Sequence, residues 1–199
     1  MLAACGGGEE SSPGATERAG TYDLRVTEAS FPSEQDLGQT SLLRLGFRNS
    51  GDETVPALTV TISIGGEQGA TSSLPFAIHD PTPGLAQAER PVWVLAATYP
   101  RLFGSSDPGG ASTSNRKTFA FGAVRPGRTV RAVWKLSAVR AGRYTLEYRV
   151  GAGLSGKAKA RTTGGVAPGG SFTTEITAEL PETEVTDSGE IVAKKSRER

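Results

Sequence analysis

The sequence predicts an all-β protein, an antiparallel β-sandwich of about seven strands, and three observations lead to this fold class. Apolar residues recur at every second position in two runs between Thr118 and Gly151, as in strands with one buried and one solvated face. No apolar period of 3.6 residues persists, so almost no helix is expected. The 26 Gly and 12 Pro punctuate the chain with turns. The inward positions of the two runs are Val130, Ala132, Trp134 and Leu136, then Tyr144, Leu146, Tyr148 and Val150.

Three strands are expected in the first third of the chain. Residues 21–30, 40–49 and 54–64 each alternate apolar and polar side chains over most of their length. The cluster Asn49–Glu53 supplies turn residues between the second and third of these strands. Three strands so close together are typical of a meander or a sandwich.

The alternation of apolar and polar residues stops between residues 65 and 117. We interpret this segment as a long insertion between the third strand and the two central runs. Loops of this length within a domain are often functional. Inside it, residues 91–97 form an apolar burst that begins with Pro91, which suits a strand at a sheet edge or a plug over the core.

The two central runs are expected to pair as a hairpin across a turn at residues 140–143. A Gly-rich loop follows at residues 152–170, and residues 171–178 form the last strand. Aromatic side chains near these elements either fill the core or line a ligand groove, and the core interpretation is favoured. These aromatic residues are Trp93, Phe119, Phe121 and Trp134.

The chain is expected to hold one domain, at residues 21–178, which includes the insertion at 65–117. Residues 1–20 form a small, polar tether, and residues 179–199 form a polar tail without periodicity. A single cysteine among 199 residues excludes a disulfide framework. No apolar run reaches the ~20 residues of a membrane-spanning helix.

The first residues, Met1-Leu2-Ala3-Ala4-Cys5 followed by three glycines, resemble the lipobox of bacterial lipoproteins. In that family the Cys becomes the acylated first residue of the mature protein. The resemblance implies an extracytoplasmic protein anchored to the bacterial cell membrane by lipid on Cys5. The alternative is a polar tail that carries a free thiol.

Two pairs of segments carry a second resemblance. Residues 47–51 followed by 55–62, and the later residues 125–130 and 141–146, resemble CARDB-type and related immunoglobulin-like domains of bacterial surfaces. Tyr144 also resembles the tyrosine corner of immunoglobulin-like folds, whose hydroxyl bonds the backbone at a strand crossover. The resemblance implies an immunoglobulin-like sandwich used for adhesion, assembly or spacing, and it does not extend over residues 65–117.

Two motifs raise the question of chemistry. Residues 151–157 follow a predicted strand and match two sequence patterns of phosphate-binding loops. However, Ala158 occupies the position where magnesium binding needs Ser or Thr, and the residues that follow cannot form the long helix that such a loop precedes. A flexible loop between strands is therefore favoured. The lone histidine, His79, is followed by Asp80, and a surface position is favoured over a catalytic one. No catalytic residue, metal site or cofactor is predicted.

Charge is distributed unevenly along the chain. Residues 1–99 contain 5 Lys/Arg and 12 Asp/Glu, whereas residues 100–161 contain 13 and 2. A hairpin at the centre would place four cations on one solvent face, which could attract an anionic partner. These cations are Arg131, Lys135, Arg143 and Arg149. The alternative is that they only solubilise a strand and neutralise the acidic first half.

The leading interpretation is a non-enzymatic lipoprotein of the cell envelope that acts as a structural or binding module. Its expected partners are the membrane, through Cys5, and an envelope protein or anionic polymer, through the basic face. Nucleic acid is not expected, and the oligomeric state is not determined. One alternative is a solute-binding lipoprotein with a pocket beneath Trp93 and the insertion. A weaker one is a hydrolase that uses His79.

Overall fold

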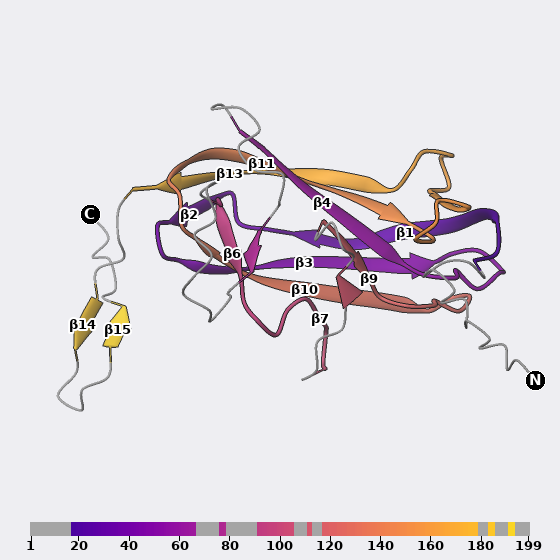
Figure 1. Cartoon of the computed structure of the whole chain (residues 1–199), viewed down its shortest axis with the longest axis horizontal. Helices are drawn as coiled ribbons and strands as arrows, with labels where there is room; N and C mark the ends of the chain where they lie inside the picture. The colour runs from indigo at the N-terminus through magenta and orange to yellow at the C-terminus, as the bar shows by residue number, and fades with distance from the viewer. Residues whose placement is uncertain are drawn as a thin grey trace, which may run out of the picture.

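The computed structural model describes residues 17–66, 76–78, 91–105, 111–112, 117–178, 183–185 and 191–193, and strands are the regular elements in these ranges. Figure 1 shows their arrangement. In chain order they are β1 (Gly20–Ser30), β2 (Glu34–Asp36), β3 (Thr40–Asn49), β4 (Thr59–Gly66), β5 (Ala77–Ile78), β6 (Trp93–Leu95), β7 (Arg101–Leu102), β8 (Ala111–Ser112), β9 (Thr118–Ala120), β10 (Thr129–Ala138), β11 (Gly142–Gly151), β12 (Ala158–Arg161), β13 (Gly169–Thr177), β14 (Thr183–Val185) and β15 (Ile191–Ala193).

Two sheets form the sandwich, and the predicted all-β, immunoglobulin-like fold class is confirmed. The first sheet has the order β12-β1-β3-β10-β6-β5, and β7 also pairs with β10. The second has the order β2-β13-β11-β4-β9-β8. Most neighbours are antiparallel, but three pairs are parallel: β12 with β1, β2 with β13, and β5 with β6. The sheets contain more than about seven strands because several strands of two to four residues extend them.

The predicted central hairpin is wrong. Strand β10 pairs with β3, β6 and β7, whereas β11 pairs with β13 and β4. The link at residues 139–141 therefore crosses from one sheet to the other. Tyr144 secures this crossover, because its hydroxyl donates a hydrogen bond to the carbonyl oxygen of Ala141 at 3.0 Å, as the resemblance to a tyrosine corner implied.

The core lies between the two sheets and contains all eight residues whose alternation predicted the strands, with Val130 partly buried. Aromatic contacts join the layers. Trp134 of β10 packs edge-on against Phe119 of β9, with ring centroids 5.8 Å apart, and Trp93 of β6 packs edge-on against Tyr144 of β11 at 5.9 Å. Both tryptophans are fully buried, so they serve the core rather than a ligand groove.

Several further differences separate the structure from the sequence prediction. β2 lies in the expected loop at residues 31–39, and β12 lies in the expected loop at 152–170. β6 is paired on both sides, with β10 and β5, so the apolar burst at 91–97 is no edge strand. In the polar tail, β14 and β15 pair with each other and lie outside the sandwich (Figure 1).

Candidate anion-binding face

The outer face of the first sheet gathers cations from four strands. Alternation along β3 buries every second side chain and turns Arg44 and Arg48 outward. The register places Arg48 opposite Arg25 of β1, and it places Val133 of β10 between Arg44 and Arg101 of β7. Together with the outward positions of β10, this surface, here called the basic face, contains Arg25, Arg44, Arg48, Arg101, Arg131 and Lys135.

Two carboxylates of β1 also point outward on this side. Asp23 is paired with Arg161 of β12, so the carboxylate among the six cations is Glu28. It approaches Arg131 across β3, with Oε2 3.7 Å from Nε. Gly46 lies between them in the register, and a Cβ there would come within 2.9 Å of the Glu28 Cβ. Both partners are well exposed, at 59% and 36% of their side chains, so the pair contributes little to stability.

The other cations of the basic face make no ion pair with a residue in the described ranges. Arg25 and Arg48 stand directly opposite each other, and such like-charged cross-strand pairs are destabilising. Arg101 lies 4.7 Å over the ring of Tyr99 and donates to the carbonyl of Thr98. The face therefore has a formal net charge of about +5.

An exposed aromatic residue borders the basic face. The amide of Phe103 donates to the carbonyl oxygen of Arg131 at 2.8 Å, which continues the pairing of β7 with β10. Phe103 is 67% exposed. An exposed apolar side chain therefore lies beside the charges of Arg101 and Arg131.

The outer face of the second sheet is different in character. Arg143 and Arg149 of β11 point outward there, as the alternation of β11 requires. Arg143 stands opposite Glu175 of β13, and hydroxyl side chains such as Thr145 and Thr173 cover much of the rest. The described carboxylates on this face are Glu34, Asp36, Glu147 and Glu175.

The prediction that these four cations share one face of the protein is therefore wrong. All four side chains are outward, but Arg131 and Lys135 lie on one side of the sandwich and Arg143 and Arg149 on the other. Four of the six cations of the basic face were absent from the predicted site: Arg25, Arg44, Arg48 and Arg101. The outward parity of the first three was readable, but the pairing that brings β1 and β3 beside β10 was not.

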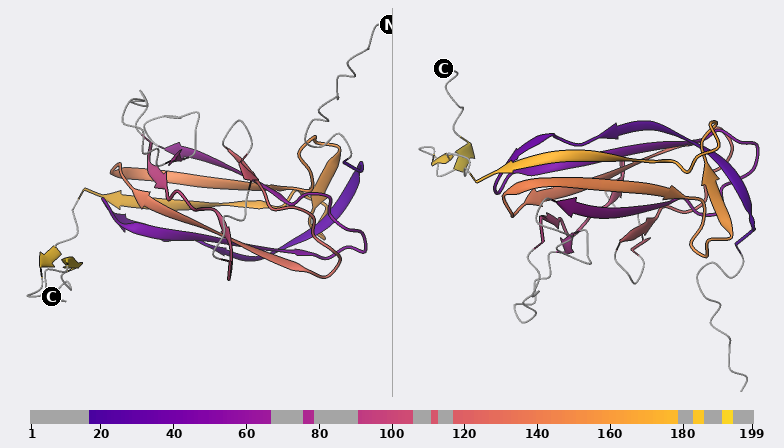
Figure 2. Two further views of the ribbon diagram at one scale, coloured as in Figure 1. Left: turned by 60° about the horizontal axis from the view of Figure 1, so that its bottom comes forward. Right: turned by 90° about the horizontal axis from the view of Figure 1, so that it is seen from above.

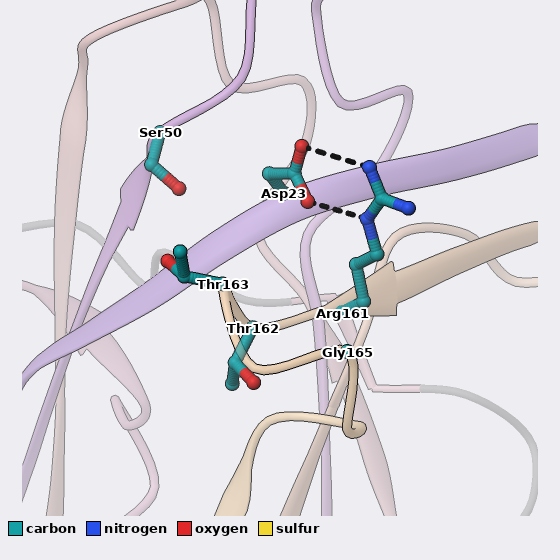
Figure 3. A pocket seen from close by; sticks show the side chains of 6 residues that line it. All are labelled: Asp23, Ser50, Arg161, Thr162, Thr163 and Gly165. Atoms are coloured by element: carbon teal, nitrogen blue, oxygen red, sulfur yellow. Dashed lines mark hydrogen bonds and ion pairs between the residues drawn. The ribbon is translucent and has the colours of Figure 1, made fainter.

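A cavity of about 400 Å³ opens at the edge of the first sheet, lined by Asp23, Ser50, Arg161, Thr162, Thr163 and Gly165 (Figure 3). Arg161 of β12 donates to both carboxylate oxygens of Asp23 of β1, at 2.6 and 3.2 Å. This hydrogen bond and the charge of Arg161 lower the pKa of the Asp23 carboxyl. The pair satisfies both charges and joins two parallel strands, so it is structural rather than a reactive acid and base.

Other predicted features lie beyond these surfaces. Cys5 and His79 are outside the described residues. In the part of the chain that the structure describes, no three His, Cys, Asp or Glu side chains gather as metal ligands. No helix there has the length and apolar character to cross a membrane.

Neither a protein-family model nor a curated protein sequence matches the chain. Structural matches include a CARDB domain from Pyrococcus furiosus in complex with di-metal ions, at 12% identity, with 78% of this chain and 89% of that chain covered and a TM-score of 0.41. Native α2-macroglobulin from Escherichia coli matches at 15% identity over 85% of this chain and 21% of that one, with a TM-score of 0.42. AvmM, which catalyses macrocyclization in alchivemycin A biosynthesis, matches at 12% identity over 81% and 93%, with a TM-score of 0.44. Such distant structures indicate nothing about chemistry.

Proposed function

We propose that this protein is a non-enzymatic module of the bacterial cell envelope that binds an anionic polymer through the basic face. The observation that carries the proposal is the accumulation of six cations against two carboxylates, Asp23 and Glu28, on the outer face of β1, β3, β10 and β7. An extended sheet surface of one sign attracts a partner that spreads its charge over a similar area.

The contrast between the two outer faces supports this proposal. If outward arginines only kept the strands soluble, cations and carboxylates would be mixed on both sides, as they are on the second sheet. On the first sheet Arg25 and Arg48 face each other without a carboxylate between them, although that arrangement costs stability. Local rules are most often broken where a surface has a function.

A charge-reversal experiment tests the basic face. Arg44→Glu combined with Arg48→Glu lowers the net charge of the face by about 4, and we expect binding to immobilised polyphosphate to weaken at least about tenfold. The matched control is Arg143→Glu combined with Arg149→Glu, which makes the same charge change on the second sheet. Binding by the unmodified protein should fall as salt screens the charges.

The outcomes separate the possibilities. Equal losses in both double variants would show that only total charge matters, and the basic face would be rejected. Preferential binding to an acidic envelope protein, with no binding to polyphosphate or to a carboxylated polysaccharide, would reject the polymer in favour of the protein partner. Circular dichroism of both variants verifies that they are folded.

We also propose that a lipid on Cys5 holds the module on the outer side of the cytoplasmic membrane. The support is the resemblance of residues 1–5 to a lipobox and the small, polar residues that follow, which suit a flexible tether. When the full precursor is expressed in a bacterium, a palmitate analogue should label the protein, and Cys5→Ser should abolish labelling and release it from membranes. Continued membrane retention of Cys5→Ser would contradict the anchor.

The alternative functions gain no support from the described residues. Trp93 is fully buried and donates its Nε1 hydrogen to Gln35 Oε1 at 3.0 Å, so it offers no surface to a solute. The residues that line the cavity beside Asp23 and Arg161 all come from outside the insertion at 65–117.

A further inference from the structure

The loop between β11 and β12 binds a carboxylate of its own chain. The main-chain amides of Leu154 and Ser155 donate to Oε2 of Glu17 at 2.8 and 2.9 Å. The amide of Ala158 donates to Oε1 at 3.0 Å. Both carboxylate oxygens are thus used, by three donors that converge from one short loop. Successive amides arranged in this way form an anion-binding concavity, or nest, and hydrogen bonds to an ionised acceptor are stronger than neutral ones.

The loop is shaped for close approach of the carboxylate. A Cβ added to Gly153 would lie 1.8 Å from Glu17 Oε1, so any larger residue there must displace the carboxylate. Gly156 has a φ of 78°, in the left-handed region that glycine tolerates, and this turn brings the Ala158 amide to the same side as those of Leu154 and Ser155. These are the residues of the motif that resembles a phosphate-binding loop.

The sequence favoured a flexible loop at residues 151–157, whereas in the structure the amides of this loop bind a carboxylate of the same chain. In a phosphate-binding loop the amides and a following helix cradle a nucleotide, whereas here the loop leads into strand β12. The anion is supplied by Glu17, which precedes β1 by three residues.

Residues next to Glu17 make further hydrogen bonds that hold the start of β1 in place. The amide of Gly20 donates to the carbonyl oxygen of Lys157 at 3.2 Å, and the parallel pairing of β1 with β12 starts there. The Tyr22 hydroxyl donates to the carbonyl oxygen of Arg18 at 3.2 Å. Figure 2 shows the start of β1 beside β12 at one end of the sandwich.

We propose that residues 153–158 form a carboxylate-binding nest whose ligand is Glu17, and that this contact pins the segment before β1 against the β12 end of the sandwich. The nest thereby holds residues 17–19 at that end of the sandwich. This inference is independent of the basic face and of any lipid on Cys5.

Electrostatics are consistent with an ionised ligand in the nest. Burial raises the pKa of the Glu17 carboxyl, but the hydrogen bonds from the Ser155, Ala158 and Leu154 amides together lower the pKa below its ordinary value. A carboxyl whose pKa falls on folding stabilises the folded state above its unfolded pKa, and this stabilisation is lost as the pH falls through the folded value. The contact between the Glu17 carboxylate and the loop amides should therefore weaken at acid pH.

The test compares Glu17→Gln, Glu17→Ala and the matched control Glu147→Gln, which removes a carboxylate from the outer face of the second sheet. Hydrogen exchange measured by NMR should become at least about tenfold faster at the Leu154, Ser155 and Ala158 amides in Glu17→Ala. Trypsin should then cleave faster after Arg18. Glu17→Gln should show a smaller effect in the same direction, and the control should show none.

A second variant keeps the carboxylate and removes its site. Gly153→Ala should expel Glu17 and reproduce the faster cleavage after Arg18, because the added methyl group occupies the position of Oε1. Unchanged exchange in Glu17→Ala would overturn the nest. Faster exchange with unchanged cleavage would overturn the pinning of the N-terminal segment.

Discussion

Asn49→Ala should be among the most destabilising polar substitutions in this protein. Asn49 ends β3 and is fully buried, and its side chain makes three hydrogen bonds. Nδ2 donates to the carbonyl oxygens of Glu53 and Val124, both at 2.8 Å, and Oδ1 accepts from the amide of Gly51 at 3.0 Å. The side chain thus holds the turn after β3 and attaches it to the segment that leads into β10.

The expected loss in the free energy of unfolding depends on which hydrogen bonds the partners of Asn49 still make after the substitution. The Val124 carbonyl retains a hydrogen bond from the amide of Val55, whereas the Glu53 carbonyl and the Gly51 amide lose the partners that Asn49 gave them. Three lost hydrogen bonds at about 1 kcal/mol each give a loss of roughly 3 kcal/mol. That is a large part of the 5–15 kcal/mol typical of a folded domain.

Urea denaturation followed by tryptophan fluorescence measures this loss, because Trp93 and Trp134 are both buried. The control is Ser50→Ala at the neighbouring position, which should change the free energy of unfolding by less than about 0.5 kcal/mol. A loss below about 1 kcal/mol for Asn49→Ala, with an unchanged denaturant slope, would refute the reasoning that this amide organises the turn.

Three further predictions concern other polar contacts. Trp93→Phe removes the hydrogen bond to Gln35, whose Nε2 is already without a partner, and urea denaturation should show a loss of about 2–3 kcal/mol, part of which Gln35→Leu in the same protein recovers. Tyr144→Phe should cost about 1 kcal/mol in the same assay, through the hydroxyl bond at the sheet crossover; no loss would argue against a tyrosine corner. Arg161 lowers the pKa of the Asp23 carboxyl in the folded state, so the protein should lose stability as the pH falls below the ordinary pKa of an aspartate. Asp23→Asn should show a smaller loss of stability over this pH range, which thermal melts at a series of acid pH values would measure.

Alternation predicted which side chains face the core, and it succeeded because a strand turns successive side chains to opposite faces whatever its neighbours are. Trp134, Leu136, Leu146 and Tyr148 are all buried as predicted. The signal was weakest for short strands. β12 has four residues in a Gly-rich stretch and β2 has three, which is too short for a period to be read.

Part of the candidate site was also readable, since the outward positions of Arg44, Arg48, Arg131 and Lys135 follow from the same alternation. The grouping of these residues was not readable. Arg143 is close to Lys135 in the sequence but belongs to the other sheet, whereas Arg48 is distant in the sequence and lies one strand away from Arg131.

By itself, then, the sequence determined the all-β class and the inward and outward faces of the long strands. Only the tertiary structure decided which strands are neighbours, that the cations divide between two outer faces, and that the loop between β11 and β12 binds the carboxylate of Glu17. The physical reason is that side-chain alternation specifies a face but not a partner. Strands pair through main-chain amides and carbonyls that are nearly the same at every residue, so partners are selected by the packing of the whole core.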